Sequence, residues 1–358
     1  MRQAGRSWLW VIVVAASARA EVPGADRVVV DLAGREVRVP SEVRRIGCLE
    51  VLCYEKLFLL GASDRIAMMI ETDAPWMRVT NPAVDGIQQL SSDPSIEELL
   101  TQHVDVVFRT FGYPEPGKVE RLAAMGLPVL VSQAMGSQSI DNAEAFVESR
   151  KRMLRLFGRV LGPQYEARAE AWCAYHDAQV ARVRSRVEGI PAEARPRVFY
   201  VRGPQANHTQ GLGSNSFWYG VLAGADMVAK HSPLVGRGDL SMEELVKWNP
   251  NVIVVGRQYS SALVTGDPRW SSIDAVKTGR VRELPEGVFY WDGSTEGVLL
   301  MLYLAKELYP ERFADLDLKE EIRQYYARFY RFTLSDRMLE VMLQGRGPDG
   351  LRHNQRRN

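Results

Sequence analysis

One long stretch of the sequence, from Pro163 to Val187, predicts a single uninterrupted helix of about seven turns. Pro163 suits the first turn, and Gly189 with Pro191 end the helix. Apolar residues recur at spacings of three and four, which predicts one stripe facing a core: Tyr165, Ala169, Trp172, His176, Val180, Val183 and Val187. At about 1.5 Å per residue the helix is roughly 37 Å long, too long for an ordinary connector. We therefore expect a connecting helix between two bodies.

The chain length favours two lobes, because 358 residues exceed the size at which one core usually keeps growing. Strands alternate with helices on both sides of the connecting helix, which predicts an α/β fold with mainly parallel sheets flanked by helices. We expect an N-terminal lobe at 21–162, the connecting helix at 163–187, a C-terminal lobe at 188–344 and a frayed tail at 345–358. Residues Lys319 to Leu343 are expected to be helical.

The charge of the chain is balanced, with 45 Lys and Arg against 44 Asp and Glu and a net charge of +1. Such a balance gives no basic field for nucleic acid, so no nucleic-acid partner is expected. Any charged ligand must be met by local groups.

The first 20 residues have the pattern of a secretory signal peptide. Arg2 and Arg6 precede the apolar run Trp8 to Ala16, and small residues flank a cleavage point near Ala20. The apolar run is too short to span a bilayer. We expect a periplasmic protein, soluble after cleavage.

The three cysteines are Cys48, Cys53 and Cys173. Their spacing does not match a Cys-x-x-Cys metal site. A disulfide between Cys48 and Cys53 stays open, but we favour small buried side chains.

A short segment is repeated on either side of the connecting helix. Ser95 to Val106 corresponds to Ser241 to Val252 at one constant offset, 243 minus 97 being 146. Each copy contains a helix-capping box, Ser-x-x-Glu. Glu97 and Glu243, at the second helical position, are not required by the box, so they are either first-turn acids favoured by the helix dipole or two equivalent acidic contacts for a partner.

Candidate ligand residues follow the strands, because ligands of parallel sheets usually lie beyond the carboxyl ends of the strands. Arginine recognises anionic oxygens, and aromatic rings give flat contact area to an organic ligand. Core packing is the alternative for each aromatic. The candidates are Glu50, Trp76, Arg109, Tyr113, Tyr200, Arg202, His208, Asn215, Trp218, Arg257, Tyr259, Tyr290, Trp291 and Glu296, with Phe111, Gln258 and Asp292 beside them.

The histidines differ in their expected roles. His176 lies on the apolar stripe and is expected to be packed, and His103 is replaced by Asn249 in the other repeat, which suits a polar helix end. His208, in a Gly-flanked loop, is the best candidate to touch a ligand or a metal, and His231 is a weaker one. No histidine motif with metal-ligand spacing is present.

Catalysis finds little support in the sequence. It contains no Gly-x-Ser-x-Gly elbow, no phosphate-binding Gly-rich loop with Lys and no recognisable nucleophile with a base.

From Val28 to Leu343 the chain resembles the periplasmic solute-binding proteins of ABC importers for ferric siderophores, haem and cobalamin, whose two lobes are joined by one long helix. The resemblance is carried by Asp31-Leu32-Ala33-Gly34-Arg35, by the two Ser-x-Glu-Glu-Leu segments, by Gly279-Arg280-Val281 and by the ending Tyr309-Pro310-Glu311-Arg312-Phe313.

The resemblance implies a monomeric receptor, not an enzyme, in which Glu97 and Glu243 dock onto arginines of an inner-membrane permease. It implies a cargo that is a small-molecule metal chelate (an iron complex, haem, a corrinoid or a nickel or cobalt chelate) and no covalent cofactor. The loop with His208 departs from the usual acidic, Gly-rich version, which weakens the case for a standard siderophore. An exported enzyme acting on a metal cofactor, such as a chelatase, and a receptor without an importer are the alternatives.

Overall fold

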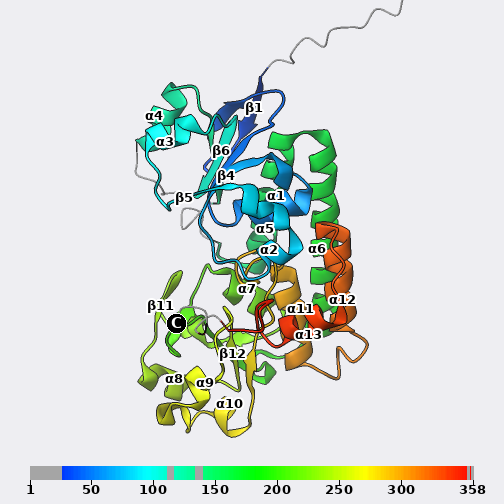
Figure 1. Ribbon diagram of the computed structural model, residues 1–358. Coiled ribbons are helices and arrows are strands. Elements are labelled where there is room, and N and C mark those ends of the chain that lie inside the picture. Colours follow the sequence, from blue (N-terminus) through cyan, green and yellow to red (C-terminus); the bar gives the residue numbers. More distant parts are fainter. Residues whose placement is uncertain (1–25, 111–116, 134–139, 353–354, 356–358) are drawn as a thin grey trace, which may run out of the picture.

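The computed structural model describes residues 26–110, 117–133, 140–352 and 355, so the expected signal peptide lies outside the described residues. Figure 1 shows two lobes, with helix α6 running beside both of them. Helix α6 spans Pro163–Val187, which confirms the predicted connecting helix. Its buried residues are those of the predicted stripe, with Cys173 added. The stripe therefore contributes to a core shared by both lobes.

The N-terminal lobe is built on five parallel strands in the order β5-β4-β3-β6-β7. The strands are β3 (Ile46–Leu49), β4 (Ile66–Ile70), β5 (Gln88–Leu90), β6 (Val106–Thr110) and β7 (Val129–Gln133). The helices of this part of the chain are α1 (Cys53–Leu60), α2 (Met77–Thr80), α3 (Ile96–Thr101), α4 (Lys118–Ala124) and α5 (Ala143–Leu161). Phe108 stacks on Phe157 of α5, whereas Val107, the next residue back along β6, packs in a separate cluster with Leu99 and Leu122. Helices thus cover both faces of the sheet, as the parallel arrangement requires.

The second lobe has four parallel strands in the order β10-β8-β12-β13. The strands are β8 (Arg197–Val201), β10 (Asp226–Met227), β12 (Val252–Val255) and β13 (Val281–Glu283). The helices are α7 (Asn215–Leu222), α8 (Met242–Trp248), α9 (Ala262–Thr265), α10 (Asp274–Lys277), α11 (Gly297–Leu308), α12 (Leu318–Tyr325) and α13 (Asp336–Leu343). The two sheets confirm the expected α/β fold with parallel strands in each lobe.

Two antiparallel strand pairs complete the strand inventory of the described residues: the hairpin of β1 (Arg27–Val30) with β2 (Glu36–Val39), and the pair of β9 (His208–Gln210) with β11 (Arg237–Asp239). The Asp31–Arg35 motif is the turn of the first hairpin. Asp31 accepts hydrogen bonds from the Arg35 guanidinium and from the backbone N–H of Val131, which ties the hairpin to β7.

The predicted repeat is present as α3 followed by β6 and α8 followed by β12. The Ser95 and Ser241 hydroxyls each cap their helix, and the glutamate three residues on accepts a hydrogen bond from the backbone N–H of the serine. His103 and Asn249 both adopt left-handed backbone conformations, with φ of 49° and 43°. The two copies therefore also agree in the way that each helix ends.

Cys48 and Cys53 form a disulfide, with a Cα–Cα distance of 5.5 Å. Our preference for small buried thiols is thus wrong for these two residues. The chain turns between the last residues of β3 and the first residue of α1, which brings the two Cα atoms into bonding range. Cys173 is a buried free thiol.

The C-terminal helical region differs from the prediction in two ways. The expected helix from Lys319 to Leu343 is interrupted, because Arg331 adopts φ of 54° and its guanidinium donates to the backbone carbonyl of Phe58. The expected frayed tail is wrong for residues 345–352, which fold back so that Arg352 forms an ion pair with Glu283 at the end of β13.

Candidate ligand site between the lobes

The loops that follow the strands of the two sheets meet directly. The backbone N–H of Trp76, after β4, donates to the carbonyl of Gly287, after β13, at 3.2 Å. The Tyr290 hydroxyl donates to the carbonyl of Asp73 at 3.4 Å. The carboxyl ends of the two sheets therefore face each other, which is where ligands of parallel sheets bind.

Arg257 is the centre of a buried polar cluster on the C-terminal side of this junction. It follows β12 in a left-handed conformation, with φ of 58°. Its guanidinium contacts both carboxylate oxygens of Asp292, at 2.9 and 2.6 Å, and lies 4.3 Å from the centre of the Tyr290 ring. Its backbone N–H donates to Glu286, whose other oxygen accepts from the N–H of Trp291. The charge of Arg257 is thus already compensated within the protein.

Glu286 is fully buried beside the Arg257–Asp292 pair. Burial and the nearby Asp292 carboxylate raise the pKa of Glu286 well above its usual value. The carboxyl therefore favours its neutral form and adds little negative charge to the cluster.

Arg202 follows β8, the strand next to β12. The carboxylate that acts on Arg202 is Asp292, which is already paired with Arg257. The Arg202 Nε is buried without a hydrogen-bond partner, and no ion pair links it to a carboxylate of the described residues. Burial and the neighbouring Arg257 lower the pKa of Arg202. Because a guanidinium does not lose its proton in proteins, a partly buried arginine without an ion pair of its own favours an anionic ligand.

On the N-terminal side, Glu50 is committed to a structural ion pair. Its carboxylate lies 2.8 Å from Nζ of Lys56, and both side chains are 1% exposed. Thr110 Oγ1 donates to the other oxygen at 3.5 Å. Arg109, on β6, is buried among charges that include Arg35, Glu120 and Asp31.

The predicted aromatic candidates lie mostly in the core. Trp76, Tyr200, Trp218, Tyr290 and Trp291 are at most 7% exposed. Among the aromatic candidates that the structure describes, only Tyr259 is partly exposed, and its ring packs against the backbone of Gly203. Tyr113 and Phe111 lie outside the described residues. The structure thus favours the core-packing alternative for these five rings.

The remaining candidates have local structural partners. His208 Nδ1 lies 2.5 Å from Asp239 across the antiparallel β9–β11 pair. Asn215, which begins α7, donates to the Gly293 carbonyl at 3.5 Å. Glu296, just before α11, accepts hydrogen bonds from two backbone N–H groups and from Tyr326.

His176 is packed as predicted. It has no exposed surface, and its Nε2 lies 3.4 Å from the Tyr219 hydroxyl. Burial lowers the pKa of His176 to about 4, so the ring is neutral near pH 7.

The described residues contain no group of three or more His, Cys, Asp and Glu side chains that could hold a metal ion. His208 with Asp239 alone is therefore an incomplete metal site.

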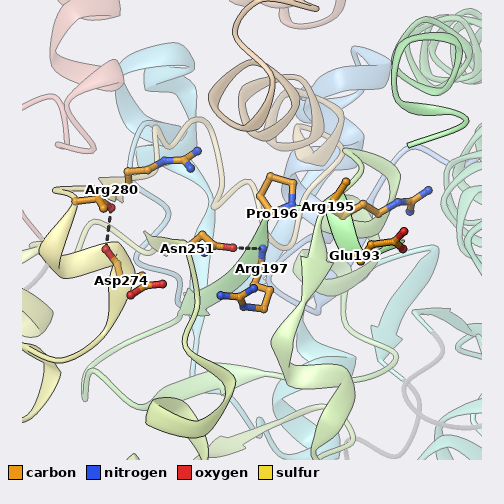
Figure 2. A pocket seen from close by; sticks show the side chains of 9 residues that line it. Glu193, Arg195, Pro196, Arg197, Asn251, Asp274 and Arg280 are labelled. Atoms are coloured by element: carbon orange, nitrogen blue, oxygen red, sulfur yellow. Dashed lines mark hydrogen bonds between the residues drawn. The ribbon is translucent and has the colours of Figure 1, made fainter. Parts of the chain in front are cut away.

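A surface hollow of about 320 Å³ lies elsewhere, at the opposite ends of the C-terminal strands. Figure 2 shows Arg197, Asn251 and Arg280 around it, with the Arg197 backbone bonded to the Asn251 side chain. Because Arg197 begins β8 and Asn251 precedes β12, this hollow is remote from the carboxyl ends that meet at the lobe junction.

Glu97 and Glu243 are both exposed in the first turns of α3 and α8. In Figure 1 these two helices lie on the same side of the molecule, away from α6. The repeat thus presents two equivalent acids, one on each lobe.

Two residues at the junction were missed by the sequence analysis. Glu286 lies between Pro285 and Gly287 just after a strand, and this position could have identified it as a candidate site residue. Arg150 is buried in α5, where a charged residue interrupts the apolar series of Phe146, Leu154 and Phe157. That interruption of an apolar stripe was the available signal.

In the described part of the chain, no helix is both long and apolar enough to cross a membrane.

Comparison with known proteins agrees with the two-lobed architecture. A family described as periplasmic binding protein matches residues 48–288. The molybdate-binding protein MolA of Haemophilus influenzae is 26% identical over 333 residues, covering 86% of this chain and 92% of that protein. The structure of MolA bound to molybdate is similar with a TM-score of 0.77 and 24% identity, over 87% of this chain and 99% of MolA.

Other solved structures share the fold at lower identity. A periplasmic solute-binding protein from Veillonella parvula has a TM-score of 0.74 at 23% identity, over 89% of this chain and 97% of its own. CeuE of Helicobacter pylori with Ni(II) bound has a TM-score of 0.70 at 21% identity, over 88% of this chain and 99% of its own. Because the family match spans more than half of the sequence, the chain belongs to the periplasmic binding protein family, and its fold is that of the solute-binding proteins of ABC importers.

Proposed function

We propose that this protein captures a small, metal-containing anion between its lobes and delivers it to an ABC importer. The observation that carries the proposal is the Arg202 guanidinium, a partly buried cation at a strand end whose Nε has no hydrogen-bond partner and whose neighbouring carboxylate, Asp292, is paired with Arg257. A tetrahedral oxyanion such as molybdate offers negatively charged oxygens to such a group. The 26% identity to a molybdate-binding protein supports the same class of cargo.

The packing at the junction favours a compact cargo over a large planar chelate. The two lobes are in direct contact, because the backbone N–H of Trp76 donates to a carbonyl of the C-terminal lobe and the Tyr290 hydroxyl donates to a carbonyl of the N-terminal lobe. Haem or a corrinoid would need these contacts to open and the buried rings to be uncovered. An oxyanion, in contrast, brings its own oxygen shell around the metal, so it needs no cluster of protein metal ligands.

We also propose that Glu97 and Glu243 are the contacts to the permease and that the receptor acts as a monomer. Both side chains are exposed, and neither forms an ion pair within the described residues. Two equivalent acids on two lobes suit a partner that presents two basic patches, since complementary charges orient such encounters.

The proposal is tested by thermal unfolding of the mature protein, residues 21–358, with a panel of ligands. The panel contains molybdate, tungstate and sulfate, and also haem, cobalamin, a ferric siderophore and a nickel–histidine complex. A ligand at 100 times its Kd stabilises the folded state by about 2.7 kcal/mol. We expect molybdate or tungstate to raise the melting temperature, with smaller shifts for the chelates. A shift with a chelate and none with any oxyanion would overturn the assignment of the cargo.

A further inference from the structure

Arg150, near the middle of α5, is a second buried guanidinium without a counterion. Its side chain belongs to a residue only 8% exposed, and Nη1 is buried with no hydrogen-bond partner. Its Nε donates a hydrogen bond to Ser149 Oγ at 3.3 Å, and its guanidinium carbon lies 5.3 Å from the centre of the Phe146 ring. Neither contact supplies a negative charge.

The charges around Arg150 do not balance. The Glu50 carboxylate attracts the Arg150 guanidinium electrostatically, but Glu50 is already paired with Lys56 at 2.8 Å. The Tyr219 hydroxyl, which also acts on Arg150, is neutral, as is His176 beside it. Two cations therefore share one carboxylate. An isolated buried charge is costly unless it is paired, so this arrangement calls for one more anion.

The position of Arg150 places this excess charge where the lobes meet. Helix α5 packs against α7, and Figure 1 shows the two helices at the junction of the lobes. One turn before Arg150, Phe146 meets Tyr219 of α7 edge to face, with ring centres 4.8 Å apart. Arg150 thus belongs to the N-terminal lobe and lies at its boundary with the C-terminal lobe.

We propose that Arg150 is a cargo-binding residue, which contacts the anion from the N-terminal lobe while Arg202 contacts it from the C-terminal lobe. The inference rests on the proposed function. On the C-terminal side, Arg257 and Arg202 share the Asp292 carboxylate, as Arg150 and Lys56 share Glu50. Each lobe therefore carries one positive charge in excess. The site therefore matches a dianion, such as molybdate, tungstate or sulfate, in preference to a monoanion of the same shape.

Perrhenate is the probe that separates charge from shape, because it is tetrahedral and carries a single negative charge. Isothermal titration of wild-type protein is expected to give tighter binding of molybdate than of perrhenate. The R150M variant is expected to weaken molybdate binding by about tenfold or more, as for the loss of a hydrogen bond to a charged group. It should also lose most of the preference for the dianion, whereas R150K, which keeps the charge, should retain that preference.

The control is R159M, which removes an exposed arginine from the same helix and should leave both affinities unchanged. Melting temperatures without ligand test the structural alternative. If Arg150 binds cargo, R150M should keep or raise the melting temperature, because it removes an uncompensated charge. A lower melting temperature with unchanged molybdate affinity would overturn the inference and assign Arg150 to packing over Phe146. Absence of oxyanion binding by the wild-type protein would instead overturn the proposed function itself.

Discussion

Glu296 gives a pH-dependent stability that can be worked out from its surroundings. The side chain has no exposed surface, and its oxygens accept hydrogen bonds from the backbone of Val288 and Phe289 and from Tyr326 at 2.6 Å. Burial, with a further contribution from Glu55, raises the pKa of Glu296 to about 8 against these hydrogen bonds. The folded protein therefore holds a proton here that the unfolded chain releases at a pKa near 4.5.

The sign and size of the effect follow from this difference. The stabilisation is fully present below pH 4.5 and is lost as the pH rises through about 8. The pKa difference of about 3.5 units, at about 1.4 kcal/mol per unit, corresponds to a change on the order of 5 kcal/mol in the free energy of unfolding. The contribution of this residue should thus fall by about 1.4 kcal/mol per pH unit between pH 5.5 and 7.5.

Urea unfolding of wild type and E296Q at pH 5.5, 6.5, 7.5 and 8.5 measures this contribution. Glutamine has nearly the same size but cannot ionise, so the wild-type advantage over E296Q should shrink steadily with rising pH. The exposed Glu340 offers a matched control, and E340Q should follow the wild type at every pH. Parallel pH profiles for wild type and E296Q would contradict the raised pKa of Glu296, because they would mean that Glu296 has the same charge in the folded and unfolded states.

The same protonation supports the ligand site. Glu296 holds the backbone of residues 288 and 289, and the segment from Glu286 to Asp292 supplies both carboxyl groups that contact Arg257. Loss of the Glu296 proton should therefore loosen the segment that keeps Arg257 compensated.

Three further predictions address other parts of the molecule. Replacing both cysteines (C48S/C53S) should cost about 2 kcal/mol of stability in urea unfolding, from the loop entropy of a link between residues 5 apart; stability equal to the wild type would contradict it. The double reversal E97K/E243K should abolish uptake in cells while leaving cargo binding intact, and normal uptake would remove the docking assignment. D292N should lower stability by about 3 kcal/mol in urea, because it leaves a buried guanidinium unpaired; an unchanged unfolding midpoint would show that the ion pair is not needed.

Much of the architecture could be predicted because it depends on local pattern. The spacing of apolar residues defined both ends of α6 and its buried stripe, including the packed His176. The internal repeat located two capped helices and their following strands, down to the shared left-handed conformation of His103 and Asn249. These features are fixed by neighbours in sequence, so sequence alone reveals them.

The features that escaped prediction depend on contacts between distant segments. The disulfide needs the turn after β3, and the helix break at Arg331 needs the carbonyl of Phe58 from the other lobe. Trp76 and Trp291 follow strands as crevice residues would, but both side chains are buried in the folded protein. Arg150 could not be recognised as lacking a counterion until Glu50 was seen to be paired with Lys56.

Capture of an anion by Arg202 is tested most directly by isothermal titration of molybdate into wild-type protein and into R202M, at the same pH and salt concentration. R337M, which removes an exposed arginine on α13, is the matched control. We expect saturable binding by wild type and R337M and a loss of roughly tenfold or more in the affinity of R202M. Equal affinity in all three proteins, or no binding by the wild type, would contradict the claim that an uncompensated arginine between the lobes captures an anionic cargo.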